Sequence, residues 1–188
     1  MMKNDEWGAV AYLSRSKYGK NEEVTINSNS SYYTGGGSGN TYVNNGAQST
    51  TGNVWGVYDM SGGAWEYVAA YVNNGHSNLT TYGSSLVNAE AKYKDVYSKG
   101  SSDSYSNNYA VSTPANGHYG DAVWETSNSG TSTNSWYSDY SDFPFTSHPF
   151  FFRGGYCNVG TRAGVFYFNG NSGGSYSNYS FRVVVPVL

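Results

Sequence analysis

The chain has 188 residues, a length that suits one domain with its own core. Only 12% of its residues are charged and the formal net charge is −3, so it lacks the basic surface that nucleic acids and anionic membranes require. No apolar run approaches the roughly 18 residues of a membrane span, and the first ten residues lack the apolar stretch of a secretion signal. We therefore expect a single domain over residues 1–188, with no nucleic-acid partner and no membrane span.

Two helices are predicted in the first hundred residues. With Asn4 as N-cap, Trp7, Val10 and Ala11 share one helical face, and Gly19 is a stop signal, which predicts a helix from Asp5 to Tyr18. A second helix is expected from Ser85 to about Lys99, before Gly100, because apolar residues recur there at helical spacing. A further helical turn is expected over residues 122–127.

Long polar stretches separate these elements, and the end of the chain reads as strands. Residues 22–53 and 99–120 are rich in Gly, Ser and Asn, which predicts functional loops or disorder. Residues 164–168 ("GVFYF") and 181–188 ("FRVVVPVL") are aromatic and β-branched, so we expect central strands of an antiparallel sheet. Pro186 would mark the point at which strand pairing stops.

The composition favours a binding surface. The chain contains 20 Tyr and 24 Gly, and Tyr, Gly, Ser and Asn are the residues that binding loops prefer. Its five Trp and eight Phe argue against a disordered low-complexity chain. The lone Cys157 cannot form an internal disulfide and belongs to no metal or redox motif.

Four sequence motifs, in this order along the chain, resemble those of a known family. They are "NDEWGAVAYLSRSKYG" (4–19), "GVYDMSGGAWEYVAAY" (56–71), "RGG" (153–155) and "SFRVV" (180–184). The second resembles the Gly-Asn-Val-Trp-Glu-Trp signature of the formylglycine-generating-enzyme-like (sulfatase-modifying-factor) branch of the C-type lectin fold. Here Gly63 replaces the Asn, Tyr67 the second Trp, and Ser180 the Gly of a closing Gly-Phe-Arg.

The resemblance implies an α+β, C-type-lectin-like fold with two main helices, short antiparallel strands and long loops. Within it we expect Trp65 to be buried in the core. We expect Arg153 and Arg182 to lock loops by donating hydrogen bonds to backbone carbonyls, because a guanidinium offers several donors in one plane. Family members usually have strands before the first helix, so we also expect an upstream segment or a larger parent protein.

Catalysis is not expected. Oxidases of the family use a cysteine pair and copper, whereas this chain has one cysteine. Related iron-dependent members use a histidine triad, but His76, His118 and His148 are scattered along the chain. We predict no cofactor. An acid/base pair or a calcium site among the carboxylates is the alternative, and a buried hydrogen-bonded role is favoured for Glu66. The candidate carboxylates are Asp59, Glu66, Asp121 and Glu125.

Residues 153–185 form the candidate ligand-binding region. They resemble the variable region of diversity-generating retroelement proteins, in which adenine-directed mutagenesis rewrites codons between fixed words. Here "RGG", "AGVFYF" and "FR" are separated by residues that can all be reached from the Asn codon AAC, including Cys157 (TGC), Val159 (GTC) and Arg162 (CGC). The expected ligand-binding positions are Tyr156, Cys157, Asn158, Val159, Thr161, Arg162, Tyr167, Asn169, Asn171, Ser172, Tyr176, Asn178 and Tyr179.

The resemblance implies a non-catalytic, receptor-recognition protein whose partner is a protein or glycan on another cell or host surface. It also implies display on a bacterial cell surface or a phage particle, through a segment outside this chain. We expect the loop 155–163 and the segment 168–181 to share one solvent-facing patch, with the last strand returning antiparallel beside residues 163–168. A fixed-sequence carbohydrate-binding lectin and a degenerate enzyme of the family are the alternatives.

Overall fold

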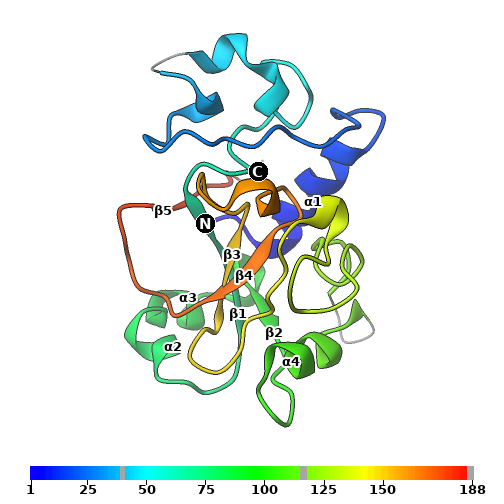
Figure 1. Cartoon of the computed structure of the whole chain (residues 1–188). Coiled ribbons are helices and arrows are strands. Elements are labelled where there is room, and N and C mark those ends of the chain that lie inside the picture. Colours follow the sequence, from blue (N-terminus) through cyan, green and yellow to red (C-terminus); the bar gives the residue numbers. More distant parts are fainter. Residues whose placement is uncertain (39–40, 115–117, 186–188) are drawn as a thin grey trace.

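A five-stranded mixed sheet organises the chain, which has an α+β architecture. The computed structural model describes residues 1–38, 41–114 and 118–185. The long strand β1 pairs antiparallel with β3 and parallel with both β2 and β5, and β4 pairs antiparallel with β3 (Figure 1). The strands are β1 (Trp65–Val72), β2 (Asp95–Tyr97), β3 (Phe150–Arg153), β4 (Phe168–Asn171) and β5 (Tyr179–Phe181).

Helices are few and, after the first, short. The α-helices are α1 (Asn4–Arg15), α2 (Asn78–Thr81), α3 (Ser84–Asn88) and α4 (Tyr105–Val111). Single 3-10 turns are η1 (Thr34–Gly36), η2 (Thr41–Asn44), η3 (Gly46–Gln48), η4 (Ala91–Tyr93), η6 (Trp136–Ser138) and η7 (Gly160–Arg162). In the described part of the chain, none of these helices has the length and apolar character of a membrane span.

The first predicted helix is confirmed, with a different N-cap. Lys3 is the N-cap, and its backbone N–H donates to the Glu6 carboxylate over 2.7 Å. Asn4 lies inside the helix, where its buried amide donates to the Tyr97 hydroxyl over 2.7 Å. The chain leaves the helix at Ser16, and a Cβ on Gly19 would lie 2.1 Å from the Leu13 carbonyl oxygen, so the stop signal is a steric requirement.

The second predicted helix is wrong beyond its first turn. Helix α3 ends at Asn88, the backbone of Ala89 is extended, and the chain then forms η4 and the strand β2. Tyr97, the last residue of β2, is buried, and its hydroxyl donates to Asp121 over 2.6 Å. Pairing with β1 and burial of this ring override the helical spacing, because tertiary context outweighs local propensity.

The two predicted C-terminal strands are also corrected. Strand β4 starts only at Phe168, because the Phe166 N–H donates to the Asp139 carboxylate (2.9 Å) and the Trp7 indole donates to the Val165 carbonyl (2.8 Å), which hold this stretch in a turn. Strand β5 is three residues long and pairs parallel with β1, not antiparallel with β4. The expected stop at Pro186 lies outside the described residues.

Several elements of the structure were not predicted from the sequence. Strands β1 and β3 were not anticipated, and α4 lies in a stretch predicted as loop, where Ser104 caps it by accepting the Asn107 N–H. Residues 124–126 form a turn and no helix. In the described part of the polar stretch 22–53, regular structure is limited to the turns η1 to η3 and a single β-bridge between Asn27 and Gly62. Figure 1 shows this stretch in blue and cyan as a separate layer at the top, away from the strands.

The two faces of the sheet have different cover. Val68, Ala70 and Val72 of β1, with Phe151 and Phe168, join Trp7 and Ala11 of α1 in the main core. On the opposite face, Tyr71 and Phe150 pack with Leu79 of α2 and Leu86 of α3 in a smaller cluster. This smaller cluster covers only one end of this face of the sheet. At the other end, around Trp65 and Phe152, other residues pack on the strands.

Candidate ligand-binding surface

Aromatic and amide side chains fill the uncovered end of the sheet. Because side chains alternate along a strand, Trp65 and Tyr67 of β1 point away from the main core. The strand pairing sets Tyr179 beside Trp65 and Asn169 beside Phe152. We call this surface the aromatic face and define it as Trp65, Tyr67, Phe152, Tyr156, Asn169, Asn171, Tyr176 and Tyr179.

Ring contacts make the aromatic face continuous. Tyr156 stacks on Trp65 with ring centroids 5.4 Å apart, and Trp65 stacks on Phe152 at 5.3 Å. Phe152 meets Tyr179 edge to face at 4.6 Å, and Tyr179 meets Tyr176 at 5.0 Å. Three rings, those of Trp65, Phe152 and Tyr179, therefore connect the loop after β3 to the loop before β5 on one surface, since aromatic pairs at these distances attract each other.

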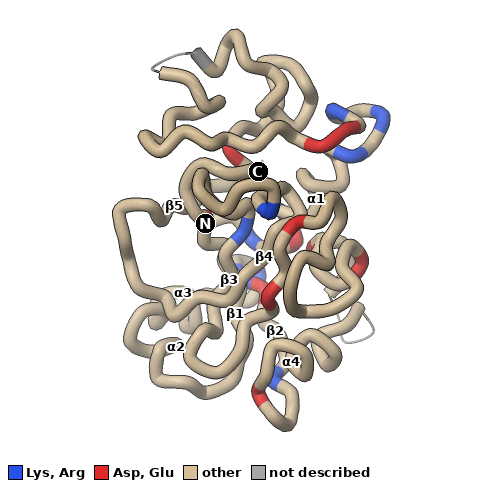
Figure 2. The backbone as a smooth tube through the Cα atoms, viewed as in Figure 1, with Lys and Arg blue, Asp and Glu red and all other residues tan. Residues whose placement is uncertain are grey.

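Hydrogen bonds fix the lower part of the face. The Tyr67 hydroxyl lies 2.5 Å from Asn171 Oδ1 and 2.8 Å from the Gly174 carbonyl oxygen. The Asn171 amide donates to the Tyr179 hydroxyl over 3.4 Å. Burial raises the pKa of Tyr67, so its hydroxyl keeps its proton as a donor. The segment 172–178 that follows carries no charged residue and runs along the left of Figure 2 as an unbroken tan tube.

Backbone contacts hold the loop after β3. Gly154 and Gly155 have positive φ angles of 78° and 72°, a conformation that favours glycine. The Gly154 carbonyl accepts hydrogen bonds from the N–H groups of Gly62 and Gly164, and the Cys157 N–H donates to the Gly63 carbonyl over 2.8 Å. The backbone of this loop is thus positioned by main-chain atoms, and its outward side chains contribute little to that positioning.

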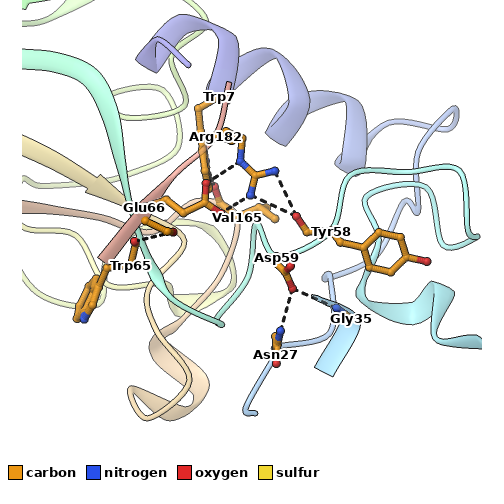
Figure 3. Close-up of polar contacts among 10 residues, drawn as sticks. Trp7, Asn27, Gly35, Tyr58, Asp59, Trp65, Glu66, Val165 and Arg182 are labelled. Carbon is orange, nitrogen blue, oxygen red and sulfur yellow. Dashed lines mark hydrogen bonds and ion pairs between the residues drawn. The ribbon is translucent and has the colours of Figure 1, made fainter. Parts of the chain in front are cut away.

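Arg182, the residue that follows β5, connects the end of this strand to β1. The Arg182 guanidinium binds both carboxylate oxygens of the buried Glu66 and donates to the Tyr58 carbonyl over 3.2 and 3.3 Å (Figure 3). Burial raises the pKa of Glu66, and Arg182 opposes that rise. Asp59 follows Tyr58 in the chain. Its carboxylate accepts hydrogen bonds from the Asn27 side-chain amide and the Gly35 N–H, which anchors the polar stretch 22–53.

The expected structural role is confirmed for Arg182 and in part for Arg153. Arg153 is fully buried and donates to the Ala122 carbonyl over 3.1 Å, but its Nε and Nη1 atoms have no hydrogen-bond partner among the described residues. Burial lowers its pKa to about 10, which still leaves it charged at neutral pH. Arg182 holds a backbone carbonyl in the same way, and Glu66 is the buried, hydrogen-bonded carboxylate that the sequence favours.

Most of the expected ligand-binding positions are accessible. Asn158, Thr161, Arg162 and Tyr176 are exposed, and the half-buried ones are Tyr156, Val159, Asn169, Asn171, Ser172, Asn178 and Tyr179. Tyr176 is the most exposed tyrosine among these positions, at 67%. The motifs 153–155 and 163–168, which were expected to be invariant and flank these positions, are buried.

Two of the expected positions are buried and are corrected. Cys157 is 5% exposed, because its backbone is bonded to Gly63 and its side chain faces inward. Tyr167 is 2% exposed, since its ring packs on the edge of Trp65 (5.3 Å) and against Tyr140 (5.7 Å). Its hydroxyl accepts from the Asn169 amide over 3.1 Å. Tyr167 therefore contributes to the surface only at the floor of a small pocket that Trp65, Arg162 and Asn169 also line.

Three residues of the surface were not anticipated as such. Trp65, expected in the core, is half-buried and sits at the centre of the aromatic face. Tyr67 is half-buried on the same face. Phe152 is only 2% exposed and lies beneath the rings of Trp65 and Tyr179 that stack against it. The alternation Trp65-Glu66-Tyr67, with a buried carboxylate between two outward rings, is the strand signal that would have placed them.

The histidines and carboxylates do not gather into a site. His118 stacks on Tyr97, His148 on Phe145, and His76 accepts from the Asn78 N–H. Within residues 1–38, 41–114 and 118–185, no group of three or more His, Cys, Asp or Glu residues is placed to hold a metal ion. Burial raises the pKa of Asp121 to about 6, and the Tyr97 hydroxyl opposes that rise.

Comparisons with protein-family models, with curated proteins and with solved structures find no match to this chain.

Proposed function

We propose that this protein is a non-catalytic ligand-binding protein that presents a diversified C-terminal surface for recognition of a receptor. In this proposal it has the C-type-lectin-like fold of the formylglycine-generating-enzyme-like family and works as the variable proteins of diversity-generating retroelements do. Its partner is a protein or glycan on another cell or host surface, and it is displayed on a bacterial cell or phage particle.

The burial pattern of residues 153–185 is the observation that carries the proposal. Two of the three motifs expected to be invariant, 153–155 and 163–168, are buried, whereas Asn158, Thr161, Arg162 and Tyr176 between and after them are exposed. In the third motif, 181–182, Arg182 is half-buried and Phe181 is 59% exposed. Substitutions at exposed side chains usually change stability by no more than about 0.5 kcal/mol. Sequence change at these positions would therefore alter what the surface binds without costing the fold.

The composition of the surface gives a second support. Tyrosines and asparagines dominate the aromatic face, and such residues supply large contact areas and adaptable hydrogen bonds at little entropic cost. Rigid strands beneath them reduce the ordering cost of binding.

The coding DNA tests the proposal. We expect a near-identical template repeat beside a reverse-transcriptase gene, with mismatches confined to template adenines and falling on codons of the exposed positions such as Asn158 and Arg162. Mismatches at codons for buried residues such as Phe166, or the absence of a repeat, would contradict diversification. Calcium-dependent binding on a glycan array would instead favour a fixed-sequence lectin, and copper-dependent oxidation of a cysteine peptide would favour an enzyme.

A further inference from the structure

A small cavity beside Trp65 and Asn169 of the aromatic face has the chemistry of an anion-binding pocket. Its volume is about 210 Å³, below the roughly 300–1,000 Å³ of pockets that take whole small-molecule ligands. It therefore suits one side chain of a larger partner. Its lining residues are Trp65, Tyr140, Val159, Arg162, Tyr167 and Asn169, and none of them is acidic.

The cation at this pocket is available to a ligand. The Arg162 guanidinium lies over the Tyr140 ring, 5.6 Å from its centroid, while its backbone carbonyl accepts the Tyr140 N–H over 3.0 Å. These two contacts orient the exposed side chain. Among the described residues, the ion pairs leave Arg162 without a carboxylate partner.

Two neutral donors complete the lining. The Tyr167 hydroxyl accepts from the Asn169 amide over 3.1 Å, which leaves the hydroxyl proton free to be donated elsewhere. Burial raises the pKa of Tyr167, so that proton is retained at neutral pH. The second amide hydrogen of Asn169 is a further donor at the same pocket.

From this arrangement we infer that the pocket binds the carboxylate of an Asp or Glu side chain of a protein ligand, with Arg162 as the charged donor and Tyr167 and Asn169 as neutral donors. A guanidinium matches a carboxylate with two parallel hydrogen bonds. The inference rests on the proposed function, because it names the chemical group that the surface recognises. A protein side chain is favoured over an acidic sugar because Trp65 is already packed by three neighbouring rings.

One nearby acid acts against the ligand. Asp142 is two residues from Tyr140, and its backbone N–H donates to the carbonyl of Phe168, the neighbour of Tyr167, over 3.0 Å. Burial raises the pKa values of Tyr140 and Tyr167, and the charge of Asp142 adds to both rises. Burial raises the pKa of Asp142 to about 6, which leaves it largely ionised at pH 7.5. Its removal should therefore strengthen the binding of an anion at this pocket.

Titration with matched small probes tests the inference. We would add N-acetylglutamate methylamide or N-acetylglutamine methylamide to the ¹⁵N-labelled protein and follow the Arg162 side-chain N–H and the Trp65 indole N–H by NMR. The glutamate probe should shift both signals saturably, and the neutral glutamine probe should bind about tenfold more weakly or not at all. Equal binding of the two probes would overturn the inference.

Variants of the pocket sharpen the test. Arg162→Gln should abolish the response to the glutamate probe, Arg162→Lys should weaken it because the planar fork is lost, and Asp142→Asn should strengthen it. Arg15→Gln is the matched control, since Arg15 is an exposed arginine at the same 5.6 Å from a tyrosine ring, that of Tyr137. A response that persists in Arg162→Gln would contradict the inference.

Two outcomes separate this inference from the proposed function. Tighter binding of N-acetylneuraminate than of the glutamate probe would overturn the assignment to a protein side chain. Failure of every acidic probe, together with a template repeat in the coding DNA, would overturn the pocket inference alone and leave the proposed function standing.

Discussion

Replacement of Arg182 by Met should destabilise the protein by leaving a buried carboxylate unpaired. Arg182 binds both oxygens of Glu66, which is 4% exposed, and also donates to the Tyr58 carbonyl. Removal of one partner of a buried ion pair costs about 3–5 kcal/mol. For a chain of this length each kcal/mol lowers the melting temperature by about 2–4 °C, so we expect a fall of roughly 6–20 °C.

The loss should depend on pH in a defined direction. Burial raises the pKa of Glu66 above its ordinary 4.5, and Arg182 lowers it, so the pKa in Arg182→Met rises further. A carboxyl whose pKa is higher in the folded state destabilises that state as pH rises above the unfolded value. Arg182→Met should therefore be closer to wild type at pH 5 than at pH 8, as measured by urea unfolding monitored by tryptophan fluorescence.

A double-mutant cycle with Glu66→Gln supplies the control. The neutral amide removes the unpaired charge, so the double variant should be more stable than Arg182→Met at pH 8. A loss below about 1 kcal/mol in Arg182→Met, or the same loss in both backgrounds, would refute the assignment of a buried, coupled pair.

Three further predictions test the fold. Trp7→Ala should cost about 3–5 kcal/mol, because Trp7 is fully buried and its indole bonds Val165, whereas Trp55→Ala, at an 89% exposed position, should leave the melting temperature unchanged; equal effects would contradict the core. Burial raises the pKa of Asp139 to about 8, so its contribution to stability falls as pH rises from about 4 to 8, and Asp139→Asn should flatten the stability profile over that range; an unchanged profile would count against its burial. Ser104→Ala should cost about 1 kcal/mol in urea unfolding through loss of the α4 cap, and no loss would argue against this helix.

The sequence predicted local features better than long-range ones. Helix α1 was predictable because Trp7 and Ala11 share a face and Gly19 is sterically required after the helix. The prediction of a second helix was wrong because residues 95–97 pair with β1, and helical spacing in the sequence cannot reveal such a long-range contact. Strand β5 was expected beside β4, but it pairs with β1, more than a hundred residues earlier in the chain.

The candidate surface was predictable to a similar extent. The loop residues Asn158, Thr161 and Arg162 were identified because small and polar residues separate the buried words. Trp65 and Tyr67 were missed as surface residues because they lie in a strand that the sequence does not predict. Their loop partners, Tyr156 for Trp65 and Gly174 for Tyr67, come more than ninety residues later in the chain. Cys157 and Tyr167 were misplaced because burial of single loop residues depends on packing against distant elements.

The central claim is that residues 153–185 combine a fixed scaffold with a replaceable surface. The most direct measurement compares the thermal unfolding midpoints of two triple variants in this segment. Serine at Tyr156, Arg162 and Tyr176 should cost only about 1–2 kcal/mol and lower the midpoint by roughly 2–8 °C. Serine at the buried Val165, Phe166 and Phe168 should abolish the cooperative transition. Loss of cooperative unfolding in the first variant, or its retention in the second, would contradict the separation of scaffold and surface.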